Sequence, residues 1–176
     1  MKELEQDQKR SYNIVLIGFM GTGKSAVAHY LHKTYGMDVI EVDQLIEQQE
    51  GISIPEMFHT YGEEYFRNLE TRVLTELQEQ NNYVISCGGG AVLREENIKA
   101  MKKNGRVVLL VAEPSTILER VKGTNHRPLL EGKQNIAFIT KFMEQRFESY
   151  EAAADVVIHT DGKNVRDIGE ELIAKL

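Results

Sequence analysis

The chain is poor in cysteine, in net positive charge and in long apolar runs. Among its 176 residues Cys87 is the only cysteine, so no internal disulfide can form and we expect a reducing, cytoplasmic location. The net charge of −6 disfavours a protein that binds nucleic acid or a membrane surface. No apolar run reaches the ~18 residues of a transmembrane helix, and the polar residues 1–11 lack the apolar core of a signal peptide.

Internal repeats and low-complexity linkers are also missing, which indicates a single unit. A chain of 176 residues can bury about 70% of the surface that it exposes when unfolded, enough for a compact domain without disulfides. We expect residues 1–11 to be a disordered polar extension and residues 12–176 to form one domain. We also expect a monomer without a nucleic-acid or membrane partner.

Short apolar runs alternate with helical patterns along the rest of the chain. Such alternation predicts an α/β fold, a five-stranded parallel sheet with helices on both faces. In sheets of this kind, ligands bind beyond the carboxyl ends of the strands. The predicted strands are residues 13–17, 38–42, 83–86, 106–111 and 156–159.

Helices can be placed from apolar spacing and from one proline. Pro114 stands where a first helical position is expected, and we predict a helix from there through Arg120. Apolar residues at steps of three and four mark two further buried helix faces. These residues are Phe66, Leu69, Val73 and Leu77 in one helix and Val165, Ile168 and Leu172 in the other.

The segment G-F-M-G-T-G-K-S follows the first predicted strand and fits the P-loop template G-x-x-x-x-G-K-[ST]. A strand, a glycine turn and a helix in this order aim backbone N–H groups and a helix N-terminus at a phosphate. Gly18, Gly21 and Gly23 let the backbone approach the anion. Lys24 would reach the β- and γ-phosphates and Ser25 would ligate Mg²⁺. The alternative is a glycine-rich turn that merely contains Lys-Ser.

Two carboxylates, Glu41 and Asp43, stand at the end of the second predicted strand. Side chains two residues apart on a strand share a face, so we expect both to point toward the P-loop. Phosphoryl transfer to a hydroxyl needs one carboxylate near Mg²⁺ and another near the nucleophile. The alternative is a pair of solvated acids.

Three glycines, Gly88, Gly89 and Gly90, follow the third predicted strand. Because consecutive glycines cost stability, they indicate a place where the backbone lies against a ligand, with a loose turn as the alternative. No acid ends this strand, where many P-loop NTPases carry the Walker-B aspartate. That absence argues against a hydrolysing motor or switch and leaves metal binding to Glu41 or Asp43.

Three arginines are candidates for binding anions. Arg67 has Glu70 three residues later on the same helix face, where the glutamate could orient it or form an ordinary surface ion pair. Arg127 precedes a proline, and we expect residues 123–133 to form a mobile lid that brings it to the phosphates. By pattern alone, Arg127 could also be a solvated loop residue, and Arg146 a solvated residue on a polar helix.

Taken together, these motifs resemble the shikimate kinases, small P-loop kinases of the nucleoside-monophosphate-kinase-like group. The resemblance extends over about residues 12–176. It implies a three-layer P-loop kinase sandwich with a mobile lid, in which ATP, with Mg²⁺, phosphorylates the 3-hydroxyl of shikimate to give shikimate 3-phosphate and ADP for aromatic amino-acid synthesis. The motifs, in the family's order, are G-F-M-G-T-G-K-S, E-V-D-Q-L-I-E, G-I-S-I-P-E-M-F, G-E-E-Y-F-R-N-L-E, S-C-G-G-G-A-V and R-P-L-L.

The resemblance also implies a role for each site residue. Lys24, Asp43 and Arg127 would be catalytic, and Ser25 and Glu41 would bind the metal. The residues that would bind shikimate are Asp43, Arg67, Gly88, Gly89, Gly90 and Arg146. The residues that would contact ATP are Gly21, Thr22, Gly23, Lys24, Ser25, Ala26, Arg120, Arg127 and Lys163.

Three positions depart from the family pattern. Glu41 stands where aspartate is usual, Ala26 replaces a serine or threonine, and the adenine-side turn at 159–164 lacks a common proline. Two alternatives stay open. A gluconate-type kinase should not need both Arg67 and Arg146, and a panel of hydroxy-acid acceptors would distinguish it. A non-catalytic nucleotide-binding module would show no phosphoryl transfer in a single turnover.

Overall fold

The structure, a computed structural model, describes residues 9–121 and 135–176. These residues contain a five-stranded sheet of order β2-β3-β1-β4-β5, in which all neighbouring strands are parallel. The predicted α/β class and parallel sheet are therefore confirmed. The strands are β1 (Asn13–Ile17), β2 (Asp38–Glu41), β3 (Tyr83–Ser86), β4 (Gly105–Val111) and β5 (Val156–His159).

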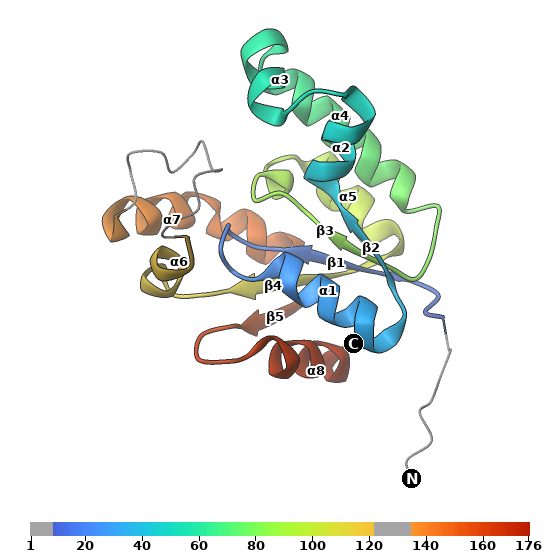
Figure 1. Cartoon of the computed structure of the whole chain (residues 1–176), viewed down its shortest axis with the longest axis vertical. Helices are drawn as coiled ribbons and strands as arrows, with labels where there is room; N and C mark the ends of the chain where they lie inside the picture. Colours follow the sequence, from blue (N-terminus) through green and yellow to red (C-terminus); the bar gives the residue numbers. More distant parts are fainter. Residues whose placement is uncertain (1–8, 122–134) are drawn as a thin grey trace.

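Helices cover both faces of this sheet (Figure 1). Three of them begin with a side-chain cap, since Ser53, Asn135 and Asn164 each accept an N–H from the first turn. None of the helices in the described ranges is both long and apolar enough to cross a membrane. The helices are α1 (Lys24–Tyr35), α2 (Val42–Glu50), α3 (Ile54–Tyr61), α4 (Glu63–Leu77), the 3₁₀ turn η1 (Ala91–Leu93), α5 (Glu95–Asn104), α6 (Pro114–Val121), α7 (Ile136–Ala153) and α8 (Val165–Lys175).

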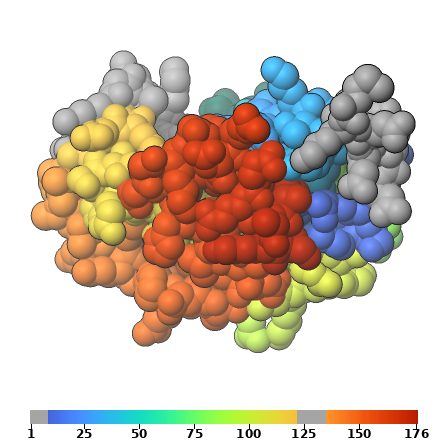
Figure 2. All heavy atoms as spheres, turned by 90° about the horizontal axis from the view of Figure 1, so that it is seen from below, coloured from blue at the N-terminus to red at the C-terminus, as the bar shows by residue number. Residues whose placement is uncertain are grey.

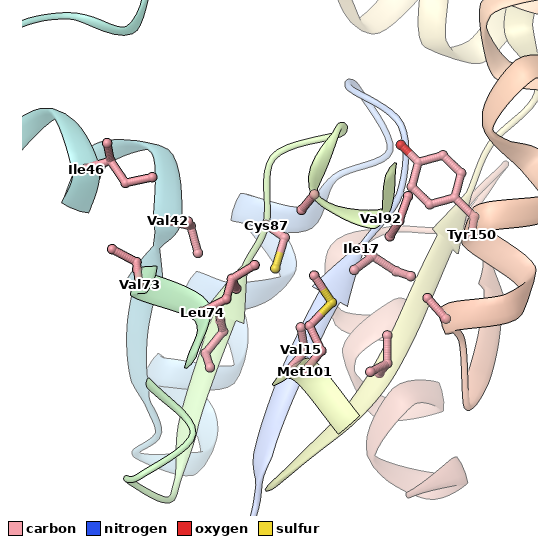
Figure 3. Close-up of a cluster of buried hydrophobic side chains, with 14 of the residues drawn as sticks. Val15, Ile17, Val42, Ile46, Val73, Leu74, Cys87, Val92, Met101 and Tyr150 are labelled. Carbon is pink, nitrogen blue, oxygen red and sulfur yellow. The ribbon is translucent and has the colours of Figure 1, made fainter. Parts of the chain in front are cut away.

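The core lies on both sides of β1, whose five residues are all buried. Successive residues of a strand point to opposite faces. Ile14 and Leu16 accordingly pack in the cluster that includes residues of α1 and α8, the two helices that cover the lower face in Figure 1 and lie side by side in Figure 2. Val15 and Ile17 pack on the other face with residues of α2, α4, α5 and α7 (Figure 3).

The register of the sheet determines which loops meet at its carboxyl edge. Ser86 of β3 pairs with Leu16 of β1 on one side and with Glu41 of β2 on the other. The Cys87 N–H then donates to the Leu16 carbonyl oxygen at 3.0 Å. The P-loop, the end of β2 and the glycines after β3 therefore leave the sheet side by side.

The structure differs from the sequence prediction at the end of the second strand. β2 ends at Glu41, and Val42 already opens α2, so Asp43 lies in the first turn of a helix. The prediction that both carboxylates share a strand face was therefore wrong. Val42 is fully buried against the core, and an apolar residue there suits a helix start as well as a strand end.

The other element predictions agree with the structure within a residue or two. The helix from Pro114 is present as α6, and Phe66, Leu69 and Val73 are buried on α4. Val165 is 37% exposed and is not part of the buried face of α8. The predicted lid at 123–133, including Arg127, lies outside the described residues.

Candidate active site

The P-loop follows β1 as the sequence predicted and closes tightly against β4. A Cβ atom at Gly18 would lie 2.4 Å from the carbonyl oxygen of Leu110, and the φ of Gly18 is +142°, so only glycine fits. The loop ends at Gly23, and α1 begins with Lys24. The Lys24 ammonium donates to the carbonyl oxygens of Gly18 and Phe19 at 2.8 and 3.0 Å, which holds its charge over the loop.

The remaining P-loop residues have distinct environments. The Thr22 hydroxyl donates to the Phe19 carbonyl oxygen at 2.8 Å and is buried, so this side chain shapes the loop. Gly21 accepts a hydrogen bond from Arg120 through its carbonyl oxygen. Ser25 and Ala26 are exposed in the first turn of α1, where the helix N-terminus favours an anion.

The two carboxylates both have an oxygen that the protein leaves unsatisfied. Oε1 of Glu41 and Oδ1 of Asp43 are buried, and neither has a hydrogen-bond partner among the described residues. Burial raises the pKa of Asp43, and the nearby Lys24 and Arg67 partly oppose that rise. Buried polar atoms without partners are uncommon in proteins. These two oxygens can therefore accept hydrogen bonds from a bound group.

The three glycines after β3 lie among the charged residues of the site. A Cβ at Gly88 would be 2.8 Å from Oδ1 of Asp43, and one at Gly90 would be 2.4 Å from Nη2 of Arg67. A Cβ at Gly89 would be 3.6 Å from Nη1 of Arg146. Backbone without side chains thus lets one carboxylate and two guanidinium groups, from three different helices, reach the same short segment.

Arg67 is held by carboxylates on its own helix. Its guanidinium donates to Oε2 of Glu70 at 2.9 Å and to Oε1 of Glu63 at 3.0 and 3.2 Å. Glu70 is fully buried, and burial raises its pKa against the opposing charge of Arg67. Oε1 of Glu70 has no hydrogen-bond partner among the described residues. The interpretation of Glu70 as the residue that orients Arg67 is consistent with this geometry.

Arg146 lies on α7, with aromatic residues one turn away on either side. Its guanidinium carbon is 4.1 Å from the centroid of the Phe142 ring, a stacked arrangement that favours a cation. Phe142 in turn packs edge-on against Phe19 of the P-loop, with centroids 5.7 Å apart. The Tyr150 hydroxyl donates to the Gly89 carbonyl oxygen at 2.6 Å.

The predicted adenine-side residues divide into one that joins the site and one that does not. The Arg120 guanidinium donates to the Gly21 carbonyl oxygen at 3.1 Å and to both oxygens of Thr160. It therefore ties the P-loop to the turn after β5. Lys163 lies in that turn, but its ammonium donates to Glu171 on α8 at 2.5 Å. Its charge is therefore paired with a carboxylate outside the site.

Sequence reasoning gave no role to Tyr150 or Thr160. Both are buried and both hydrogen-bond to site segments. The spacing of Tyr150, four residues after Arg146, places both on one side of a helix and could have drawn attention to it. Thr160 carried no comparable signal, because its partner Arg120 is 40 residues away.

Comparisons with known proteins agree with the motifs. The family model described as shikimate kinase matches residues 20–176. A curated shikimate kinase of Thermodesulfovibrio yellowstonii is 40% identical over 161 residues, covering 92% of each chain. The solved shikimate kinase of Acinetobacter baumannii, in complex with shikimate, is 32% identical with a TM-score of 0.87 and covers 94% of this chain and 92% of its own.

A second kind of kinase shares the fold alone. A gluconokinase of Sinorhizobium meliloti has a TM-score of 0.59 at 19% identity, with coverage of 96% of this chain and 93% of its own. Both the lower TM-score and the lower identity separate it from the shikimate kinase of A. baumannii. The likeness to the gluconokinase therefore supports the architecture and nothing about the acceptor.

Proposed function

This chain belongs to the shikimate kinase family, and we propose how its own residues carry out the reaction of that family. It is an ATP-dependent kinase that transfers the γ-phosphoryl group of ATP to the 3-hydroxyl of shikimate, giving shikimate 3-phosphate and ADP. One observation carries the assignment of residues: Asp43, Arg67 and Arg146 converge on the glycines Gly88–Gly90 beside the P-loop.

The nucleotide lies over the P-loop in this proposal. Backbone N–H groups from Gly21 to Ser25 and the N-terminus of α1 hold the phosphates. Lys24 leaves the carbonyl oxygens of Gly18 and Phe19 and reaches the β- and γ-phosphates. Ala26 lies one residue further into α1 and lines the phosphate side. Arg120 lies at the adenine side, where its hydrogen bonds already fix it to Gly21 and Thr160.

A Mg²⁺ ion bound together with ATP fits the residues. In the described ranges, no group of three or more His, Cys, Asp or Glu side chains could hold a metal alone. Mg²⁺ commonly takes one or two protein ligands and completes its shell with phosphate oxygens and water. We assign the Ser25 hydroxyl and the unsatisfied Oε1 of Glu41 to this duty. The bound ion would offset the negative charge of the transferred group.

The acceptor lies against the glycine segment. Arg67 and Arg146 bind the carboxylate of shikimate, because planar guanidinium groups match carboxylate geometry. Backbone groups of Gly88, Gly89 and Gly90 contact the ring. Oδ1 of Asp43 then accepts a hydrogen bond from the 3-hydroxyl and takes up its proton as the oxygen attacks.

Catalysis in this scheme is mostly positioning and charge stabilisation, as is general for phosphoryl transfer. Lys24 stabilises the charge that develops on the transferred group. Arg127 would add a second cation, and that role rests on its place in the R-P-L-L motif. Contacts of Lys163 with the nucleotide would require it to leave Glu171.

Two further properties are part of the proposal. We place the enzyme in the cytoplasm because its single cysteine allows no internal disulfide and because it acts in biosynthesis. We infer that it works as a monomer, since Asp43, Arg67 and Arg146 of one chain already converge on Gly88–Gly90.

Measurement of ADP release tests the function. The wild-type enzyme should release ADP with shikimate and Mg²⁺, and far less with gluconate or with water alone. Mass spectrometry should identify shikimate 3-phosphate as the second product. Lys24→Ala should remove turnover while the circular dichroism spectrum stays unchanged. Equal ADP release with and without shikimate, or a wild-type kcat in the Lys24→Ala variant, would contradict the proposal.

A further inference from the structure

Tyr150 is a buried residue that the mechanism above does not use. Its ring belongs to the apolar cluster between the sheet and α4, α5 and α7, and only 5% of the residue is exposed. Figure 3 shows the ring at the edge of that cluster, with the hydroxyl oxygen turned toward the loops that follow β1 and β3. There the hydroxyl donates to the Gly89 carbonyl oxygen at 2.6 Å. The residue thus joins the core to the proposed acceptor site.

This hydrogen bond is distinctive among those that the glycine segment accepts. The Gly88 carbonyl oxygen accepts the Ala91 N–H at 3.1 Å, and the Gly90 carbonyl oxygen accepts the Leu93 N–H at 3.1 Å. Both of these partners lie within three residues along the chain. The partner of Gly89 is 61 residues away, on α7. Tyr150 therefore links the segment to a separate helix.

A link of this kind matters because glycine has little conformational preference of its own. A peptide bond is planar, so a contact that fixes the Gly89 carbonyl also fixes the direction of the following N–H of Gly90. The same helix carries Arg146 one turn earlier. A Cβ at Gly89 would lie 3.5 Å from the Tyr150 hydroxyl and 3.6 Å from Nη1 of Arg146. One helix face therefore presents both a ligand for the substrate carboxylate and the group that holds the adjacent backbone.

We propose that Tyr150 is a positioning residue for the acceptor: its hydroxyl holds the Gly89 peptide in place relative to Arg146, so that backbone and guanidinium bind shikimate as one unit. The inference rests on the proposed function, because it assumes that Gly88–Gly90 and Arg146 bind the acceptor. It assigns to Tyr150 no contact with ATP and no proton transfer. Burial raises the pKa of Tyr150 to about 12, so the hydroxyl remains a donor throughout the neutral range.

Tyr150→Phe tests this directly, because it keeps the buried ring and removes only the hydroxyl. The KM for shikimate should rise about fivefold, the value expected for one net hydrogen bond. The KM for ATP should stay within about twofold. Titration calorimetry without nucleotide should show the same loss in shikimate affinity. The matched control is Tyr83→Phe, which removes a hydroxyl that donates to Gln80 beside the amino end of β3, and it should change neither KM.

A double-mutant cycle separates positioning from ordinary packing. In an Arg146→Lys background, Tyr150→Phe should raise the KM for shikimate by less than about twofold. The hydroxyl acts by holding the backbone relative to Arg146, so its effect shrinks once that arginine is replaced. A merely structural role would instead lower Tm and raise both KM values together, in either background. That result would overturn the inference, as would an unchanged KM for shikimate.

The outcomes also distinguish this inference from the proposed function. If the wild type phosphorylates shikimate and Arg146→Lys raises its KM, the proposed function stands, and a silent Tyr150→Phe removes only the role of Tyr150. If the wild type does not phosphorylate shikimate, both fall together. If Tyr150→Phe lowers Tm, the NMR chemical shifts of the Gly89 and Gly90 backbone amides in the folded variant distinguish a positioning role from a structural one. Shifts equal to those of the wild type would contradict the positioning role.

Discussion

At the residue scale, Glu41 and Asp43 differ in the element that carries each of them. Glu41 ends β2 and Asp43 lies in the first turn of α2, so the two side chains leave different elements although only one residue separates them. Asp43→Asn keeps the size of the side chain and loses its charge, and we expect kcat to fall by about 100-fold or more. Glu41→Gln should chiefly raise the Mg²⁺ concentration needed for half-maximal rate. Steady-state rates measured over a range of Mg²⁺ concentrations check both expectations. The control is Asp38→Asn, which changes a carboxylate at the start of β2.

The raised pKa of Asp43 also predicts a pH dependence. As a base, Asp43 must be deprotonated, so activity is lost as the pH falls through its pKa. Because burial raises that pKa, the acid limb of kcat/KM for shikimate should lie above the range of an exposed aspartate. An unchanged metal titration in Glu41→Gln, or an acid limb in the ordinary aspartate range, would show that the two roles are misassigned.

Arg67 and Arg146 should resist replacement by lysine for a shared geometric reason. Lysine keeps the charge but lacks the planar fork that binds a carboxylate. We expect Arg67→Lys and Arg146→Lys each to raise the KM for shikimate by about 10- to 150-fold, equivalent to ~1.5–3 kcal/mol for a charge-assisted hydrogen bond. The KM for ATP should change much less. Arg72→Lys, at a half-exposed position of α4, is the control, and equal effects on both KM values would indicate a structural role.

At the scale of elements, the sequence predicted the P-loop well and the start of α2 poorly. The P-loop is a local motif, in which neighbouring glycines, Lys24 and Ser25 determine strand, turn and helix together. The boundary at Val42 depends on burial in the cluster that α2 shares with α4 residues far along the chain, and an apolar side chain does not reveal that environment. The role of Tyr150 was missed for the same reason, because its partner Gly89 is distant in sequence.

The glycine segment yields a prediction at this scale. Gly90 has φ −95° and ψ −3°, which alanine adopts without strain, but a Cβ there would lie 2.4 Å from Nη2 of Arg67. Gly90→Ala should therefore displace the guanidinium and raise the KM for shikimate about tenfold, a loss of one charged hydrogen bond. At Gly89 no atom would be nearer than 3.5 Å to the new Cβ, so Gly89→Ala should cost less.

Steady-state kinetics and thermal unfolding together check the Gly90 prediction. The Tm of Gly90→Ala should fall modestly, because the displaced Arg67 guanidinium loosens its ion pair with the buried Glu70, while alanine restricts the unfolded chain and offsets part of that loss. In an Arg67→Lys background the added methyl group should have a smaller effect on KM. A larger loss for Gly89→Ala than for Gly90→Ala would contradict the close approach of Arg67.

At the scale of the whole molecule, the site depends on the register that brings three strand ends together. Leu16, Ser86 and Glu41 pair across the sheet, and the loops that follow them carry the nucleotide and acceptor groups. The sequence predicted five strands and their parallel direction from short apolar runs that alternate with helical patterns. It could not give the order β2-β3-β1-β4-β5, because strand order depends on packing between helices that are far apart in the chain. The identity of the acceptor came from the resemblance to a family, because the spacing of apolar residues does not encode a substrate.

Cys87 offers a measure of the stability of this assembly, since it lies between β3 and the glycine segment. It is the only thiol in the chain, it is 1% exposed, and burial raises its pKa. A raised pKa means that the thiolate forms only at higher pH, so at pH 9, above the pKa of about 8.5 of a free cysteine, Cys87 should stay protonated in the folded enzyme. We expect a thiol reagent such as Ellman's reagent to react at least ~100-fold more slowly with the native protein than with the protein in guanidinium chloride, because local unfolding must expose Cys87 before it reacts.

ATP and shikimate together should slow the reaction of Cys87 further, since they bind the folded state. Reaction of one thiol per chain at the rate of the unfolded protein, with no effect of either substrate, would show that the β3 end is open in solution and that the register described here does not hold.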